Sequence, residues 1–240
     1  MKERIITTPY TVKTDGRACF RAAVVSDTHE TDPVPVTEAV RAIAPDIIFL
    51  AGDIVEAKTP ISAALHDGAK SKPAYELINS LCRIAPVYYG LGNHEANLTP
   101  RQWENIGKTD AHLLVDSYAR VKLCGHEIVV GAVSPTGEGS ERMLADFRRQ
   151  DCYRVLICHR PERYINEFYD ERDDIALAGH AHGGQWRFFG RGIYAPGQGL
   201  FPKYTRGFYG NLLVSMGAHN SEIIPRINTP CEVLAVDFVL

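Results

Sequence analysis

Short, nearly continuous apolar runs recur along the chain and alternate with more polar segments. Strands of this composition are buried on both faces, which requires a covering layer of helices or of a second sheet. The pattern therefore predicts buried strands at residues 21–26, 46–51, 85–90, 127–133, 154–158, 174–178 and 232–240.

The segments between these runs show the periodicity of amphipathic helices. Val36, Val40 and Ile43 fall on one side of a helix. Thr99 followed by Pro100 is typical of an N-cap and a first helical position. The predicted helices cover residues 36–44, 73–84, 140–149 and 161–169, with one more beginning after Thr99. This alternation of strands and helices predicts an α/β fold.

Residues 183–217 have a different texture, rich in glycine and aromatic residues, with short strand-like pieces and little helical periodicity. We find no linker, internal repeat or low-complexity stretch. The simplest interpretation is a single domain over residues 1–240 that contains two packed sheets.

Composition and charge exclude several classes. Hydrophobic residues make up 45% and charged residues 23%, and the net charge of −3 gives no basic excess for a nucleic-acid coat. None of the six cysteines forms a C-x-x-C pair, which favours free thiols in a reducing compartment. The N-terminus has no apolar core of signal-peptide length. We therefore expect a soluble cytoplasmic protein with, at most, peripheral membrane contact.

Metal-type side chains follow the ends of the predicted strands. Residues i and i+2 project to the same side of an extended chain, so Asp27 and His29 can reach one ion. His180 and His182 have the same spacing, and open α/β folds place their sites at this end of the strands. The candidate metal ligands are Asp27, His29, Asp53, Asn93, His159, His180 and His182.

These side chains offer oxygen and imidazole but no thiolate, which suits Mn, Fe, Zn or Co. Seven ligands are too many for one ion, but with a bridging carboxylate they supply four to each of two ions. Two such ions can generate a hydroxide and clamp a phosphoryl group. Each motif taken alone also has a non-functional interpretation: a chance Asp-x-His, a turn, or a histidine in the core.

The role of other polar and aromatic residues stays open. His66, His112, His126 and His219 match no ligand position, although His219 lies in a glycine-containing loop after an apolar strand. Arg160 adjoins His159. The cations Arg187, Arg191, Lys203 and Arg206 could bind phosphate or be solvated loop charges. The aromatic residues Tyr194, Phe201, Tyr204, Phe208 and Tyr209 could line a substrate pocket or pack a sheet.

The ordered motifs Asp27-Thr-His29, Gly52-Asp53, Gly92-Asn-His-Glu95, His159 and Gly179-His-Ala-His182 strongly resemble the signature of the calcineurin-like metallophosphoesterase superfamily. The segment after His182, through Gly207-Phe-Tyr209 and Val214-Ser-Met-Gly217, with Arg226 and Pro230, resembles a bacterial phosphodiesterase subgroup. Members of that subgroup are usually membrane-anchored or exported.

The resemblance implies a four-layer α/β/β/α sandwich with two mixed sheets. It assigns one ion to Asp27, His29, Asp53 and His182, and the other to Asp53, Asn93, His159 and His180. The two divalent ions would be Mn, Fe, Zn, Ni or Co. His94 would stand at the leaving-group oxygen as a proton donor or charge stabiliser, and Glu95 would orient His94 or a ligand.

The implied function is a dinuclear metal-dependent phosphoesterase. We expect a phosphodiesterase that hydrolyses a P–O bond of a small phosphoester or diphosphate, nucleotide-linked or lipid-linked. The alternatives are a phosphomonoesterase or protein phosphatase of the same fold, and a metal-bearing scaffold without turnover. His94 argues against the scaffold, which has no chemical need for it.

Overall fold

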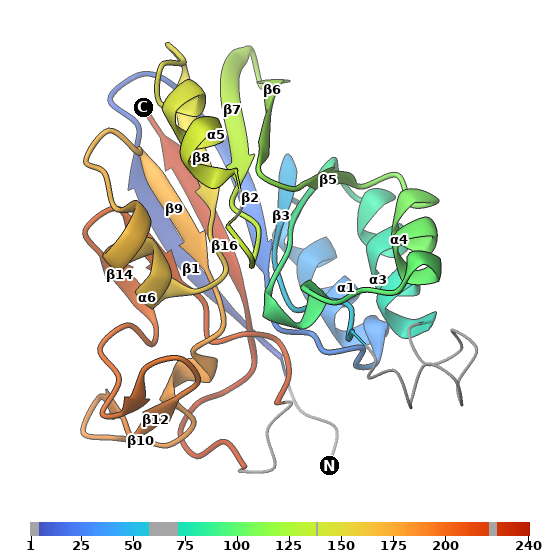
Figure 1. Cartoon of the computed structure of the whole chain (residues 1–240), viewed down its shortest axis with the longest axis vertical. Coiled ribbons are helices and arrows are strands. Elements are labelled where there is room, and N and C mark those ends of the chain that lie inside the picture. The colour runs from blue at the N-terminus through green and yellow to red at the C-terminus, as the bar shows by residue number, and fades with distance from the viewer. Residues whose placement is uncertain (1–4, 58–71, 138, 221–224) are drawn as a thin grey trace.

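The computed structural model describes residues 5–57, 72–137, 139–220 and 225–240. Two six-stranded sheets pack against each other (Figure 1). The strands of the first are, in spatial order, β1 (Ile6–Lys13), β16 (Glu232–Val239), β2 (Phe20–Val25), β3 (Ile47–Ala51), β4 (Val87–Gly90) and β5 (His112–Leu114). Those of the second are β14 (Gly207–Tyr209), β15 (Leu212–Val214), β9 (Ile175–Ala178), β8 (Tyr153–Ile157), β7 (His126–Ala132) and β6 (Ser117–Leu123).

Both sheets are mixed. Strands β2, β3, β4 and β5 are parallel neighbours, and β16 joins β2 in antiparallel register. In the second sheet β7, β8, β9 and β15 are parallel, whereas the edge strands β6 and β14 are antiparallel. The carboxyl ends of the parallel strands therefore meet at one edge of each sheet, where such folds place their sites.

Alternating side chains of the central strands face two different layers. Val24 and Phe49 pack with Val130 of the second sheet in the core between the sheets. Val25 and Leu50, one position further along, pack instead beneath the helices that cover the first sheet. Burial on both faces explains why these strands read as continuous apolar runs.

Helices cover the outer face of each sheet. They are α1 (Pro33–Ile43), α3 (Lys72–Cys82), α4 (Pro100–Gly107), α5 (Ser140–Phe147) and α6 (Pro161–Arg163), which continues into a π-helical turn over Tyr164–Phe168. Val40 of α1 and Leu77 of α3 pack against the first sheet. Phe147 and Tyr164 do the same on the second. The expected four-layer α/β/β/α sandwich is confirmed (Figure 1).

The predicted boundaries of helices and strands differ from the observed ones where a capping residue or pairing at a sheet edge sets the end of the element. Helix α1 begins at Pro33 because the Asp32 side chain accepts a hydrogen bond from the Val34 amide at 3.1 Å. Thr99 caps α4 as predicted. Strand β1 was missed because it alternates half-buried and exposed residues at the sheet edge, and a search for apolar runs does not detect that pattern.

The segment after His182 forms two small hairpins outside the main sheets. One pairs β10 (Arg187–Phe188) with β11 (Arg191–Gly192), and the other pairs β12 (Tyr194–Ala195) with β13 (Gly199–Leu200). Together with β14 and β15, they confirm the short strand-like pieces expected there. None of the helices in the described ranges has both the length and the apolar character to cross a bilayer.

Candidate metal centre

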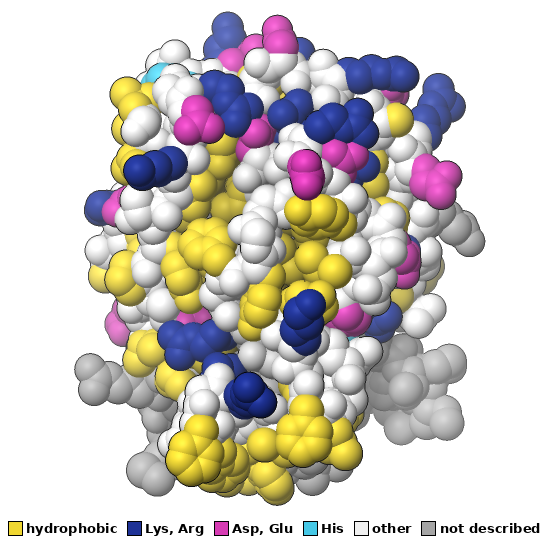
Figure 2. Space-filling model, turned by 90° about the vertical axis from the view of Figure 1, so that its left-hand side faces the viewer, with side chains coloured by type: hydrophobic (Ala, Val, Ile, Leu, Met, Phe, Trp, Pro, Cys, Tyr) yellow, Lys and Arg dark blue, Asp and Glu magenta, His cyan; other side chains and the backbone are white. Residues whose placement is uncertain are grey.

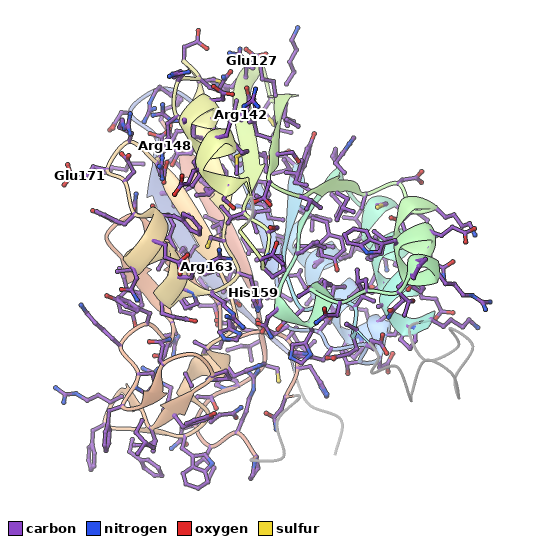
Figure 3. All side chains as sticks on the ribbon, viewed as in Figure 1. Glu127, Arg142, Arg148, His159, Arg163 and Glu171 are labelled. Carbon is purple, nitrogen blue, oxygen red and sulfur yellow. The ribbon has the colours of Figure 1, made fainter. Side chains whose placement is uncertain are left out.

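The seven candidate ligands converge at the carboxyl ends of five strands. Asp27 and His29 follow β2, Asp53 follows β3, and Asn93 follows β4 in a 3₁₀ turn over Asn93–Glu95. The remaining three are His159 after β8, and His180 and His182 after β9. Residues more than 150 positions apart in the sequence are therefore neighbours here, and Figure 3 shows His159 between the half of the molecule that carries α6 and the half that carries α1.

One cluster consists of Asp27, His29 and His182, all buried. Oδ1 of Asp27 lies 3.9 Å from Nε2 of His29 and 3.7 Å from Nε2 of His182. Spacings of this size exceed a hydrogen bond. They leave room for a cation between a carboxylate and two imidazoles.

A second cluster consists of Asp53, His159 and His180, also buried. Nε2 of His159 lies 3.0 Å from Oδ2 of Asp53 and 4.0 Å from Oδ1 of Asp27, so the two clusters adjoin. Asp53 also belongs to a third group with His29 and His94. Asp53 is thus the carboxylate that occurs in two of the three groups.

Asn93 lies beside this second cluster. It lines a recess together with His159, Arg160 and Arg163. Nη1 of Arg163 donates to the backbone oxygens of Ser134 (2.9 Å) and Pro135, and so braces the loop that forms one wall. Arg160, whose Nε is buried without a hydrogen bond in the described part of the chain, is the more available cation.

Several candidate ligand atoms are buried without a protein partner. Within the described residues, Nε2 of His29, Nε2 of His180 and Oδ1 of Asn93 have no hydrogen bond. A buried polar atom without a partner is costly, and such atoms indicate an ion or water that the protein atoms do not include. The donor set fits divalent cations that accept oxygen and imidazole.

The backbone, rather than extended-chain alternation, brings the paired ligands together. Asp27, His29, His180 and His182 all have positive φ, at 53°, 47°, 66° and 44°, as does Asp53 at 57°. The extended geometry predicted for Asp27 and His29 is therefore wrong, since both residues have left-handed backbone conformations. Non-glycine residues adopt this conformation at a cost, and such strain gathers at functional sites.

Glycines next to the ligands allow the strand-end loops to touch. A Cβ on Gly52, whose φ is +89°, would lie 2.6 Å from the Gly92 backbone, and one on Gly92 would lie 2.2 Å from Oδ1 of Asp53. Any side chain at either position would push the loops of Asp53 and Asn93 apart. The close packing of these loops therefore explains why the Gly-Asp and Gly-Asn-His-Glu motifs begin with glycine.

Glu95 organises the backbone around Asp53. Its fully buried carboxylate accepts hydrogen bonds from the amides of Asp53 (2.9 Å), Ile54 (2.6 Å), Val55 (2.9 Å) and Gly92 (2.6 Å). The Tyr89 hydroxyl donates a fifth, at 2.6 Å. Of the two roles expected for Glu95, orienting His94 or orienting a ligand, these contacts describe the second, because Glu95 holds the loop that carries Asp53.

Glu56 is a site residue that our sequence reasoning missed. Its Oε1 accepts from Nδ1 of His29 at 2.5 Å, and its Oε2 accepts from Nδ1 of His94 at 2.6 Å. One carboxylate therefore orients both a candidate ligand and the candidate proton donor. The sequence feature that could have identified Glu56 is its position three residues after the candidate ligand Asp53.

His94 stands at the edge of the centre, with 38% of its side chain exposed and Nε2 3.9 Å from Oδ2 of Asp53. The hydrogen bond to Glu56 raises the pKa of His94 to about 9. Burial would raise the pKa of Glu56, but the bonds from His29 and His94 lower it to about 2. A protonated imidazole beside an ionised carboxylate is suited to donate a proton.

The buried imidazoles differ in charge. Burial lowers the pKa of His180 to about 3 and holds that of His182 well below its usual range, so both are neutral, as ligands must be. Burial also opposes protonation of His159, but the carboxylates of Asp53 and Asp27 raise its pKa to about 10. A divalent cation would replace that proton between the same groups.

Further residues contact the centre from outside. Nη2 of Arg226 donates to Nδ1 of His182 at 2.8 Å and also to the backbone oxygen of His219. The His219 amide donates to the backbone oxygen of Asp27 at 2.9 Å, so this loop does border the site. Oε1 of Glu162 lies 3.9 Å from Nε2 of His180.

The remaining candidates lie elsewhere. Arg187 has a structural contact, since Nη1 donates to the Gly183 oxygen (3.1 Å) and Thr205 hydroxyl (2.8 Å). His112 stacks on Tyr88 and His126 begins β7, whereas His66 lies outside the described residues. Tyr204 packs on Tyr209, and Phe208 packs on Tyr10. The other cations and aromatic residues considered as substrate contacts are all exposed: Arg191, Tyr194, Phe201, Lys203 and Arg206.

The chain thus combines a four-layer sandwich with carboxylate, imidazole and amide groups at the strand ends, the chemistry of a metal-binding site. A family model described as calcineurin-like phosphoesterase matches residues 20–184. The chain belongs to the calcineurin-like phosphoesterase family.

Relatives support this membership. The chain is similar to the uncharacterized protein YpbG of Bacillus subtilis (strain 168), 26% identical over 192 residues, which cover 78% of this chain and 70% of YpbG. It is 27% identical over 192 residues to phosphodiesterase YaeI of Escherichia coli (strain K12), covering 72% of this chain and 64% of YaeI. The chain therefore spans less than two thirds of YaeI.

Among solved structures, the chain is similar in fold to the NAD nucleotidase NadN of Haemophilus influenzae. The TM-score is 0.52 at 12% identity, covering 69% of this chain and 39% of that one. At this identity the likeness concerns the fold alone.

Proposed function

We propose that this chain is a dinuclear metal-dependent phosphodiesterase. The observation that carries the proposal is the set of buried ligand atoms on His29, His180 and Asn93 that lack a hydrogen bond in the described part of the chain, gathered around Asp27 and Asp53. The proposed ligands are Asp27, His29, Asp53 and His182 for one ion, and Asp53, Asn93, His159 and His180 for the other. Manganese is the first metal to test, with Fe, Zn, Ni and Co as alternatives.

When bound, two divalent ions supply positive charge to a phosphoryl group and water of lowered pKa. The chain's own groups would do the rest. The buried carboxylates of Asp53 and Asp27 would balance the positive charge of the two ions. His94, oriented by Glu56, is placed at the exposed edge to donate a proton to the leaving oxygen. Arg160 is the cation available beside the recess.

The small number of available cations favours a diester or a diphosphate linkage as the substrate. Of the two arginines that line the recess, Arg163 is committed to loop carbonyls and, through Nε, to Glu167 at 2.9 Å. A monoanionic diester needs less added charge than a dianionic monoester. The similarity of the chain to phosphodiesterase YaeI of Escherichia coli agrees with this choice.

Turnover of bis-aryl and mono-aryl phosphates with the same metal tests the substrate class. We expect the diester to have the higher kcat/KM, because among the described residues Arg160 is the one arginine of the recess that is not committed to other groups and a monoanionic diester needs less added charge. A monoester advantage of about tenfold or more, roughly 1.4 kcal/mol in transition-state binding, would favour a phosphomonoesterase or protein phosphatase. Absence of turnover with every metal, while the metals bind, would favour the scaffold alternative.

We further propose that the enzyme works in the cytoplasm. No disulfide joins any of the cysteines, at positions 19, 82, 124, 152, 158 and 231, all of which lie in the described part of the chain. Native cells lysed in the presence of a thiol-blocking reagent, with the protein then unfolded in the same reagent, should yield protein with six modified thiols. A disulfide in that material would contradict the cytoplasmic assignment.

A further inference from the structure

The two small hairpins present a cluster of exposed apolar side chains. Phe188 and Phe189 lie at the turn of the β10–β11 hairpin, and Leu200 and Phe201 at the end of the β12–β13 hairpin. Phe189 is fully exposed, and Leu200 and Phe201 are 71% and 74% exposed. We call these four residues the hairpin patch. Figure 2 shows hydrophobic side chains gathered along the lower edge of the molecule, the end at which Figure 1 places β10 and β12, with lysine and arginine side chains above them.

The exposure of the hairpin patch is built into the local structure. Phe189 and Gly190 both have positive φ, 50° and 80°, as a two-residue hairpin turn requires. Arg187 holds this turn, since Nη2 donates to the Gly190 oxygen while Nη1 binds the Gly183 oxygen and the Thr205 hydroxyl. The turn is therefore braced from inside, with the Phe189 ring directed into solvent.

Ile193 lies between the two hairpins and closes the base of each with a backbone hydrogen bond. The Ile193 amide donates to the Trp186 oxygen, and the Phe201 amide donates to the Ile193 oxygen, each at 2.8 Å. The apolar residues thus share one platform rather than two independent loops. A contiguous exposed apolar surface of this kind usually marks an interaction site.

The charge around the hairpin patch identifies the partner. Residues 175–221 contain no Asp or Glu, although the chain has 29 of them and a net charge of −3. Arg191, Lys203 and Arg206 are exposed within this segment. A second copy of the chain would bring these like charges together. Aromatic and aliphatic tips flanked by cations complement an anionic lipid surface.

We propose that the hairpin patch inserts into the surface of an anionic lipid bilayer, with Arg191 and Lys203 at the headgroups. Docking in this way would present the metal centre to the membrane, because the hairpins pack directly on it. Gly192 contacts Gly184, two residues after His182, and a Cβ on Gly197 would lie 3.2 Å from Nε2 of His180. An amphiphilic phosphoester as substrate follows only if the proposed function also holds.

Co-sedimentation with vesicles tests the inference without turnover. We expect the full chain to bind phosphatidylglycerol-containing vesicles more tightly than pure phosphatidylcholine vesicles. The double variant Phe189→Ser/Phe201→Ser should bind the anionic vesicles at least about tenfold more weakly, since burying even one phenylalanine is worth that factor. Lys203→Gln should weaken anionic binding alone. Val34→Ser, which changes a 53% exposed residue of α1, is the matched control and should bind as the parent does.

Three results would overturn the inference: no vesicle binding by the parent, equal binding by the double variant, or a parental dimer in solution that the double variant dissociates. The last would make the hairpin patch an interface between copies. Turnover of a soluble aryl diester by the double variant shows that it is folded. Vesicle binding without any turnover would instead count against the proposed function and leave the membrane surface standing.

Discussion

Asp53→Asn is expected to hold less than one equivalent of Mn²⁺ where the parent holds about two, because Asp53 is proposed as the carboxylate that both ions share. The side chain is buried and lies 3.0 Å from His159. Burial would raise the pKa of Asp53, yet the imidazoles of His159, His29 and His94 hold it below its usual range. An amide has no negative charge to offer two cations, so both sites should weaken.

Turnover by Asp53→Asn should fall by about a thousandfold or more, which corresponds to roughly 4 kcal/mol of transition-state stabilisation. Metal content after reconstitution with excess Mn²⁺ and removal of free metal is the primary measurement. Asp237→Asn, the same change in an exposed residue that pairs with Arg21, is the control and should keep both equivalents. A saturated parental stoichiometry of one or zero, or two tightly held ions in the variant, would refute the shared carboxylate.

His94→Ala should keep its metals but lose about 10² to 10⁴ of its turnover, the usual range for removal of a general acid. His94 lies in reach of the centre through Nε2 and is oriented by Glu56, yet it is not among the seven proposed ligands. The defect should be smaller for nitrophenolate, a good leaving group that needs little protonation, than for an alkyl leaving group.

Metal analysis and turnover of both substrate types distinguish the proton donor from a ligand. His126→Ala changes a histidine at the start of β7, on another part of the molecule, and should leave both measurements unchanged. Loss of metal by His94→Ala would make His94 a ligand. Full activity on the alkyl ester would show that it donates no proton.

Much of the architecture could be predicted from the local pattern of apolar and polar residues. Strands such as β3 are apolar throughout because both faces are covered, and the stripe of Val36, Val40 and Ile43 predicts the helix that covers one of them. Strands β1 and β6 were not predicted, because edge strands are partly exposed and their side chains carry a weaker signal. Their positions depend on pairing with β16 and β7.

The sequence by itself determined which chemical groups stand at the strand ends, since carboxylate, imidazole and amide ligands are properties of residue type and order. Only the tertiary structure decided how they meet. It turned Asp27 and His29 through left-handed backbone conformations and separated His180 from His182 into different clusters. It also brought Glu56 onto two imidazoles. These outcomes depend on contacts between loops that are distant in the chain, and no local periodicity encodes such contacts.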